Sequence, residues 1–162
     1  MADLSERKGE KLAPFNPSGE EVINVAVEML ELREEDIIYE LGCGDARFLV
    51  EAVSRSGAAR AVGVEYDKQW AHRARERVRD AGLQGRIAIL HEDVMAVPIG
   101  EATALFVYLV PRGMSLLRDR LVEALRRGAR VVSYVFAIPG LESVRTEMYK
   151  KSTKIMLYTK ES

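Results

Sequence analysis

The segment at residues 37–47 constrains the fold of this chain more than any other. It reads Ile-Ile-Tyr-Glu-Leu-Gly-Cys-Gly-Asp-Ala-Arg, an apolar run that ends in an acid, then a glycine-rich turn and the start of a helix. A second apolar run ends in Glu65, about 20 residues after the turn. In α/β folds, a strand, glycine turn and helix followed by a second strand with a terminal carboxylate form a site for ligands that contain adenosine. The sequence therefore predicts such a site here.

Size and composition predict one globular domain. A chain of 162 residues can bury a single core, and we expect a flexible arm over residues 1–13 and one domain over residues 14–162. The net charge of −1 gives no overall field that would attract nucleic acid or an acidic membrane. No apolar run approaches the roughly 20 residues that span a bilayer. The single Cys43 excludes an internal disulfide and a cysteine-built metal site, so we expect no metal and a reducing, cytoplasmic compartment.

Strand and helix patterns alternate along the chain. Ser18-Gly19-Glu20-Glu21 has the pattern of a capping box and predicts a helix that runs to about Leu32. Helical periodicity predicts further helices over residues 47–56, 68–81 and 111–127, and short apolar runs predict strands over residues 37–41, 61–65, 87–91, 104–110 and 131–136. Period-two alternation at residues 144–149 and 154–159 predicts a hairpin. These units imply a parallel sheet with helices on both faces and antiparallel edge strands at the end.

Charges around the glycine turn indicate which ligand it binds. Glu40 precedes the turn and Asp45 lies within it, so a pyrophosphate would meet two carboxylates. S-adenosylmethionine instead brings an ammonium, a sulfonium and a neutral ribose. Opposite charges about 4 Å apart attract by roughly 4 kcal/mol at an effective dielectric of 20, and the same magnitude counts against a phosphate. The turn is therefore predicted to bind the sulfonium cofactor rather than a dinucleotide.

Other candidate residues follow the remaining strands. Glu65 ends the second strand, where a carboxylate can accept both ribose hydroxyls. Asp93 follows the third strand and is placed to reach the adenine amino group, although an ordinary loop acid fits equally well. Phe106 and Tyr108 lie near the end of the fourth strand, where an aromatic side chain would line either the acceptor pocket or the core.

Arginines form two groups that bear on nucleic-acid binding. The i+2 spacing of the first group scatters its members around one helix, which is typical of a solvated helix face; its members are Arg73, Arg75, Arg77 and Arg79. The second group, Arg126, Arg127 and Arg130, is smaller and could attract an acidic protein surface. Neither makes the concentrated patch that nucleic acid requires.

Taken together, these segments resemble the class I S-adenosylmethionine-dependent methyltransferases. More narrowly, they resemble the small protein-lysine methyltransferases known from archaea and, in related form, from mitochondria. The segments that carry the resemblance are Pro14-Phe15-x-Pro17, the run from Asp36 to Asp45, Ala61-Val-Gly-Val-Glu65, and Gly128-Ala-Arg-Val-Val-Ser133. The resemblance implies a Rossmann-like fold with a mainly parallel seven-stranded sheet, a C-terminal antiparallel hairpin and helices on both faces.

The resemblance also implies roles for individual residues. The methionine part of S-adenosylmethionine would lie at Glu40 and the two glycines, the ribose at Glu65 and the adenine at Asp93, with Phe15 in a segment that closes over the cofactor. The full expected cofactor-binding set is Glu40, Gly42, Gly44, Asp45, Glu65, Tyr66, Asp93, Val94 and Phe15. Tyr108 is the expected catalytic residue, in the acceptor pocket.

Some positions depart from the pattern of the family. Glu40 and Ala46 replace the commoner Asp and Gly but keep charge and small size. Leu141 stands where relatives often carry Trp, near the expected substrate contacts. The Asn-Pro-Pro-Tyr signature of enzymes that act on nucleobases or amide nitrogens is absent, because residues 108–111 read Tyr-Leu-Val-Pro.

The function predicted from these features is methyl transfer to the ε-amine of a protein lysine. The expected partner is a protein substrate, with no nucleic acid and no membrane insertion, and the chain is expected to be a monomer or a weak homo-oligomer. A cytoplasmic location is expected, and a mitochondrial association stays open if the source is eukaryotic. Three alternatives also stay open: a small-molecule methyltransferase, a non-catalytic cofactor-binding module of the same fold, and a nicotinamide-dependent reductase.

Overall fold

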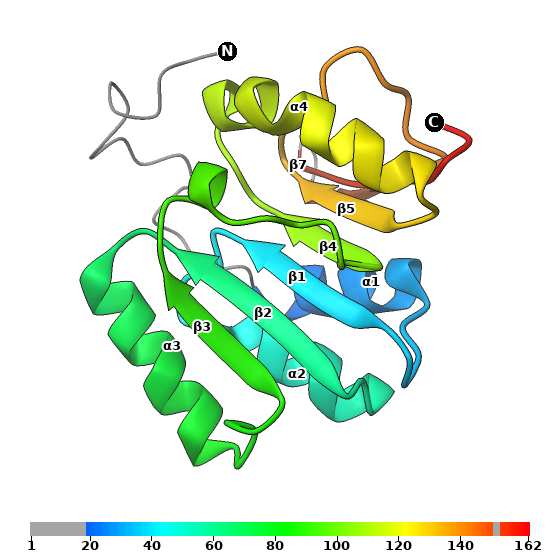
Figure 1. The fold of residues 1–162 in the computed structure, drawn as a ribbon. Coiled ribbons are helices and arrows are strands. Elements are labelled where there is room, and N and C mark those ends of the chain that lie inside the picture. Colours follow the sequence, from blue (N-terminus) through cyan, green and yellow to red (C-terminus); the bar gives the residue numbers. More distant parts are fainter. Residues whose placement is uncertain (1–18, 151–152) are drawn as a thin grey trace.

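The fold is built on one sheet of seven strands. The computed structural model describes residues 19–150 and 153–162. The strands lie in the order β3-β2-β1-β4-β5-β7-β6 (Figure 1). In chain order the elements are α1 (Glu20–Leu30), β1 (Ile37–Leu41), α2 (Arg47–Ser56), β2 (Arg60–Glu65), α3 (Lys68–Asp80), β3 (Ile87–His91), the 3₁₀-helix η2 (Val94–Ala96), β4 (Ala104–Val107), α4 (Pro111–Arg126), β5 (Arg130–Tyr134), β6 (Arg145–Tyr149) and β7 (Thr153–Tyr158).

The sheet has a parallel part and an antiparallel part. Strands β1 to β5 pair in parallel, whereas β7 runs antiparallel to both β5 and β6. The chain crosses from β1–β3 on one side to β4 on the other, so β1 and β4 are neighbours at the topological switch point. Ligands of open α/β sheets bind beside the carboxyl ends of the strands at such a point. The predicted Rossmann-like methyltransferase fold is confirmed.

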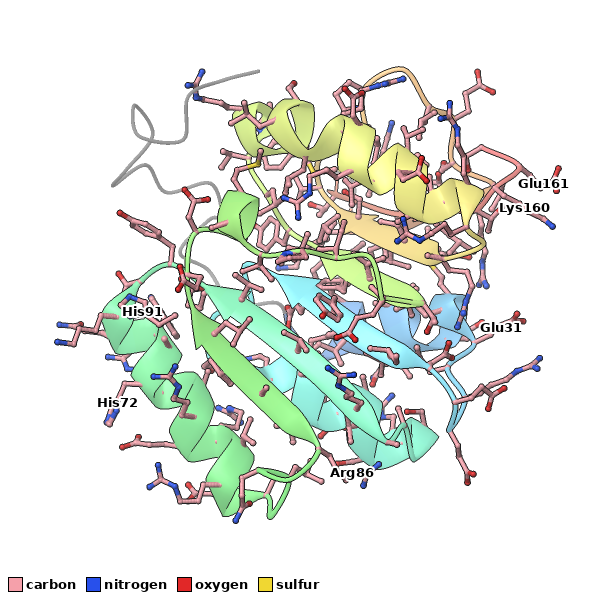
Figure 2. The ribbon with its side chains drawn as sticks, in the orientation of Figure 1. Glu31, His72, Arg86, His91, Lys160 and Glu161 are labelled. Carbon is pink, nitrogen blue, oxygen red and sulfur yellow. The ribbon has the colours of Figure 1, made fainter. Side chains whose placement is uncertain are left out.

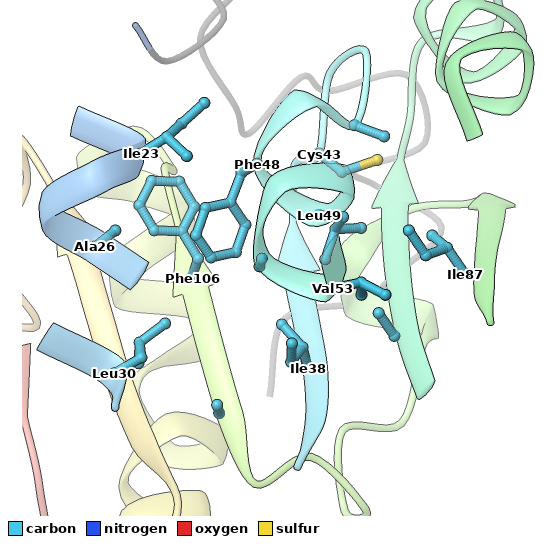
Figure 3. Close-up of a cluster of buried hydrophobic side chains, with 14 of the residues drawn as sticks. Ile23, Ala26, Leu30, Ile38, Cys43, Phe48, Leu49, Val53, Ile87 and Phe106 are labelled. Carbon is cyan, nitrogen blue, oxygen red and sulfur yellow. The ribbon is translucent and has the colours of Figure 1, made fainter. Parts of the chain in front are cut away.

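Two hydrophobic clusters hold helices against opposite faces of the sheet. One cluster joins α1, α2 and α3 to one face, and at its centre the rings of Phe48 and Phe106 stack with centroids 4.4 Å apart (Figure 3). The other cluster joins α4 and the segment after β3 to the opposite face. Burying apolar surface on both faces explains why the parallel strands are near-continuous apolar runs.

Several predicted element ends differ from the structure by one to three residues, and the fifth strand, for example, ends at Tyr134 instead of residue 136. The fourth strand was expected to reach residue 110, but β4 ends at Val107, which pairs with Leu41 at the end of β1. Beyond that point β1 turns away and offers no backbone partner. The first helix was expected to start with a capping box, yet Gly19 occupies the N-cap position without a side-chain cap. Ser18 lies outside the described residues.

A partly buried ion pair ties together the edge of the sheet opposite the predicted site. Arg130 donates to both carboxylate oxygens of Asp36, at 3.0 and 2.9 Å, and also to the backbone oxygen of Leu30. Burial alone would raise the pKa of Asp36, but hydrogen bonds from Arg130 and Thr103 lower it overall. Arg130, one of the three arginines that could attract an acidic surface, is therefore engaged within the fold. No helix among the described residues has the length and apolar character to cross a membrane.

Candidate active site

The glycine turn follows β1 and adopts the backbone conformation that glycine favours. Gly42 and Gly44 have φ values of 80° and 55°, where residues with a Cβ are strained. The backbone nitrogens of Gly42 and Cys43 both donate to the Val64 oxygen, at 2.9 and 3.0 Å, which anchors the turn to β2. A Cβ at Gly44 would meet no atom within 4 Å. The turn is therefore fixed on one side and open on the other.

Glu65, at the end of β2, is buried and holds the turn in place. One carboxylate oxygen accepts from the Gly44 backbone nitrogen at 2.9 Å, and the other accepts from the Asp67 nitrogen at 2.8 Å. Asp67, not Glu65, caps α3, because its side chain accepts from two backbone nitrogens of the first turn. Each Glu65 oxygen keeps a further lone pair, so the carboxylate can still accept a hydroxyl. The structure thus brings Glu65 to the predicted turn.

Glu40 is buried in β1, and one of its carboxylate oxygens, Oε1, has no hydrogen-bond partner among the described residues. Burial, followed by the nearby charges of Asp45 and Glu65, raises its pKa well above the usual value. An unpartnered buried acceptor is unfavourable in an empty protein and is explained where a ligand supplies the missing donor or charge. A cationic group at the turn would meet this requirement.

Asp45 lies in the turn but faces arginine side chains. Arg47 donates to both of its oxygens, the shortest contact being 2.8 Å, and Arg77 of α3 donates to Oδ2 at 3.3 Å. Burial alone would raise the pKa of Asp45, but the hydrogen bonds and charges of Arg47 and the charge of Arg77 lower it. The sequence interpretation missed both arginines as partners, and it treated Asp45 as an uncompensated charge. The repulsion of a phosphate therefore rests on Glu65 and on the ionised form of Glu40.

Asp93 and Val94 lie in the turn after β3, which α4 holds in place. Asp93 caps η2, since Oδ1 accepts from the Met95 nitrogen at 2.8 Å, and Val94 is buried. Arg120 of α4 donates to the oxygens of Val94 and Met95 at 3.3 Å each, and also to the Val97 oxygen. No pattern in the sequence links Arg120 to this turn, because the contact spans more than 20 residues.

The remaining predicted residues have different positions. Tyr66 is half-buried directly after Glu65, and its backbone oxygen contacts His91 Nε2 at 3.0 Å. Phe15 lies outside the described residues. Tyr108 is half-buried just beyond β4, and its ring lies 4.7 Å from that of Tyr134, which ends β5. His72 projects from the outer face of α3, away from the sheet (Figure 2), and pairs with Glu76 at 2.9 Å.

These features fit a nucleoside cofactor with cationic groups. The open glycine turn, the unpartnered Glu40 oxygen and the Glu65 carboxylate lie along the carboxyl ends of β1 and β2. Their acidic oxygens suit the positively charged ammonium and sulfonium and the hydroxyl groups of the ribose of S-adenosylmethionine. Among the described residues, no group of three or more His, Cys, Asp or Glu is arranged to hold a metal ion.

Comparison with known proteins agrees with this geometry. Residues 40–145 match the family model of the ANTKMT methyltransferase domain. A protein-lysine N-methyltransferase of Saccharolobus islandicus is 31% identical over 148 residues, which cover 90% of this chain and 92% of that protein. The adenine nucleotide translocase lysine N-methyltransferase of Mus musculus is 32% identical over 66% of this chain and 46% of its own length. The chain thus spans about half the length of that mouse relative.

A solved structure shares nearly the whole fold. It is described as an RNA methyltransferase from Salinibacter ruber in complex with S-adenosyl-L-homocysteine. Its TM-score is 0.83 at 30% identity, and the match covers 89% of this chain and 93% of that one. With the family model and the archaeal relative, this match places the chain in the ANTKMT methyltransferase domain family, within the class I S-adenosylmethionine-dependent methyltransferases.

Proposed function

We propose that this chain transfers a methyl group from S-adenosylmethionine to the ε-amine of a lysine in a protein. The observation that carries the proposal is the match to the archaeal protein-lysine N-methyltransferase over 90% of the chain. The geometry supports it through the open glycine turn and the unpartnered acid beside it. The site belongs to the carboxyl edge of the sheet, where open space lies beside Gly44 of the turn.

The proposed cofactor contacts follow the order of the strands. Glu40 would face the ammonium of the methionine part, and the backbone of Gly42 and Gly44 would lie against it. Glu65 would accept from the ribose hydroxyls, with Tyr66 beside it. Asp93 and Val94 would contact the adenine, and Phe15 would lie near the cofactor. Asp45 would contribute to the cofactor site indirectly. Its carboxylate already accepts hydrogen bonds from Arg47 and Arg77, so it would position these two guanidinium groups beside the turn.

The chemistry needs alignment more than a strong acid or base. When bound, S-adenosylmethionine supplies an activated methyl group: the amine lone pair forms the C–N bond, the S–C bond electrons stay on sulfur, and the surplus proton leaves to water. The amine must first lose its own proton, since its reference pKa is about 10.4. A partly apolar site beside a positive charge favours the neutral amine. The residues around the site then hold the amine in line with the methyl carbon.

RNA is the second candidate substrate, because the Salinibacter ruber structure is described as an RNA methyltransferase. The electrostatics of this chain favour protein. The groove between α2 and α3 is lined by three arginines and three acids, Arg47, Arg73, Arg77, Asp45, Glu76 and Asp80, so it carries no net charge. Arg75 is also occupied, since it donates to the Ile89 oxygen at 3.0 Å. RNA binding needs a concentrated positive surface.

The test offers the purified chain three substrates with methyl-labelled S-adenosylmethionine: cell-extract proteins, poly-L-lysine and total RNA. We expect label on lysine in the protein samples, located by mass spectrometry, and none on RNA. Label on RNA alone would overturn the proposal in favour of the second candidate. Label only on small metabolites would indicate a small-molecule methyltransferase, and cofactor binding without any transfer would indicate a binding module.

The proposal extends to the compartment and the oligomeric state of the chain. A cytoplasmic location is supported by the single buried cysteine, Cys43, which suits a reducing compartment. We expect a monomer or a weak homo-oligomer, and sedimentation of the purified chain would measure this directly.

A further inference from the structure

We infer that Tyr134, together with Tyr108, forms the aromatic wall that receives the side chain of the acceptor lysine and determines specificity for it. This inference rests on the proposed function and adds to it a residue, Tyr134, that the sequence interpretation did not single out. It is carried by the position of the two rings, by hydroxyls that no described residue hydrogen-bonds and by the buried aromatic cluster against which the rings pack.

The register of the sheet places the two tyrosines beside the glycine turn. Leu41 of β1 pairs with Val107 of β4, which in turn pairs with Ser133 of β5. The next residues along these strands are Gly42, Tyr108 and Tyr134, so all three lie in one row at the carboxyl edge. Both tyrosines pack against the same hydrophobic cluster as Phe106, on one face of the sheet. Phe106 pairs with Glu40, which places Glu40 on that face as well.

This row fixes where the acceptor approaches. Glu65 on β2 marks the ribose side of the turn, and Glu40 on β1 marks the methionine side. Moving farther along the same direction across the sheet leads to β4 and then to β5. A cofactor held by Glu65 and Glu40 in this order would present its methyl group on the β4 side of the turn, where Tyr108 and Tyr134 lie, rather than on the β3 side. An amine that attacks in line would then enter over these two rings.

The two rings lie at the surface of the sheet edge and are not part of the closed core. Their centroids lie 4.7 Å apart at an angle of 56°, and both side chains are only half-buried. No residue in the described part of the chain hydrogen-bonds to either hydroxyl. The hydrophobic cluster against which they pack contains the fully buried rings of Phe106 and Phe48, which stack on each other (Figure 3).

Each part of this wall matches a part of a lysine side chain. The ring faces offer apolar surface to the methylene stem of lysine. Burial raises the pKa of both tyrosines, so their hydroxyls remain protonated and neutral. A neutral hydroxyl oxygen can accept a hydrogen bond from the amine and leave the nitrogen lone pair directed at the methyl carbon. A charged carboxylate in its place would instead favour the ammonium, which cannot react.

The experiment compares poly-L-lysine with poly-L-ornithine, whose side chain is one methylene shorter, using Y134F, Y134A and Y39F. Tyr39 is a matched control, because its hydroxyl bonds Glu101 at 2.6 Å and its ring packs on the opposite face of the sheet. We expect the wild-type chain to prefer lysine by about tenfold, the usual discrimination for one methylene. Y134A should reduce this preference to about threefold or less, and Y39F should leave it unchanged.

Y134F separates the ring from the hydroxyl. It should keep the preference for lysine and the KM for poly-L-lysine within about twofold, while kcat falls by about tenfold through loss of the orienting hydrogen bond. Calorimetric binding of S-adenosylhomocysteine should be the same in all variants, which shows that the fold and the cofactor site are intact.

The outcomes separate this inference from the proposed function. An unchanged lysine preference and unchanged kcat in both Tyr134 variants would overturn the role of Tyr134 and leave lysine methylation standing. A wild-type chain that labels extract lysines but not poly-L-lysine would also overturn it, since a wall that reads only the side chain accepts lysine in any exposed chain. Label on RNA alone would overturn the proposed function and this inference with it.

Discussion

At the scale of single residues, Glu40 shows how the site gives up stability for binding. Its carboxyl is buried with an unpartnered oxygen, and both burial and the neighbouring acids raise its pKa. A raised pKa means that the folded protein holds this proton more tightly than the unfolded chain. The stabilising contribution is therefore complete below the ordinary value of 4.5 and is lost as the pH rises toward the raised value. A bound cation would stabilise the ionised carboxylate and so offset this loss of stability at higher pH.

Glu40→Gln tests that account. The amide cannot ionise, so the cofactor-free variant should lack the loss of stability that the wild type undergoes above about pH 4.5. At pH 9 we expect the variant to exceed the wild type by on the order of 1 kcal/mol in the free energy of unfolding. Its affinity for S-adenosylhomocysteine should fall by about tenfold or more, because the ammonium loses its partner. Urea unfolding at pH 5 and pH 9, with calorimetry, measures both effects.

The exposed substitution Glu51→Gln is the control for these measurements, since Glu51 pairs with Arg55 on the surface of α2. It should change neither quantity. If the free energy of unfolding changed with pH equally in the wild type and in Glu40→Gln, the group that titrates in this range would be another residue, which would contradict the role given to Glu40.

At the scale of the elements, the contact between β2 and α2 depends on one glycine. A Cβ at Gly63 would lie 2.7 Å from Leu49 Cδ1, 2.8 Å from Cys43 Sγ and 3.0 Å from Ile89 Cδ1. These neighbours come from α2, the glycine turn and β3, so they would all have to shift together in a filled core. Only glycine lets α2 approach the sheet this closely, and α2 begins at the candidate site.

Gly63→Ala should therefore destabilise the protein by about 1–3 kcal/mol, the range for overpacking a core. Gly100→Ala is the matched control, because a Cβ there meets nothing within 4 Å and its backbone is not left-handed. Denaturant unfolding of both variants gives the comparison. Equal stability of the two variants would mean that the core around Leu49 relaxes freely.

The link between α4 and the turn after β3 gives a second prediction at this scale. Arg120 is held by the backbone oxygens of that turn, and burial lowers its pKa. Arg120→Met should raise the KM for S-adenosylmethionine by about tenfold and leave kcat at saturating cofactor within about twofold, because it frees the turn that carries Asp93. Arg118→Met on the same helix should change neither, since Arg118 donates hydrogen bonds to Pro139 and Asp119, away from that turn. A fall in kcat alone would contradict this positioning role.

The elements and their order were predictable because their signals are local. The run from Ile37 to Arg47 predicts a strand, a turn and a helix within a few residues. The later strand–helix units of the parallel sheet show similar local signals. The end of β4 was not predictable, because the apolar run continues to Val110 while its neighbour β1 stops at Leu41. The distant partners of Asp45 and Tyr108 were also not predictable, because they depend on contacts between elements and not on a local pattern. Arg77 and Tyr134 reach them only through helix packing and strand register.

At the scale of the whole molecule, cofactor class and stability are linked. A ligand that binds only the folded state stabilises it by about 2.7 kcal/mol at a concentration of 100 times its Kd. For a chain of this size each kcal/mol shifts the Tm by about 2–4 °C. Saturating S-adenosylhomocysteine should therefore raise the Tm by about 5–10 °C, measured by calorimetry or dye fluorescence.

The same measurement with NAD and ATP tests the electrostatic argument for the cofactor. Glu40 and Glu65 are buried acids beside the turn, and Glu40 adds negative charge there when it is ionised, whereas the guanidinium groups of Arg47 and Arg77 lie on Asp45. Phosphates at the turn would therefore meet two acids that no described arginine neutralises, and we expect neither nucleotide to raise the Tm by more than about 1 °C. In Glu40→Gln the shift with S-adenosylhomocysteine should shrink, because the ammonium loses its partner, while the nucleotides still have no effect. A larger shift with NAD than with S-adenosylhomocysteine in the wild type would refute the assignment of the turn to a cationic cofactor.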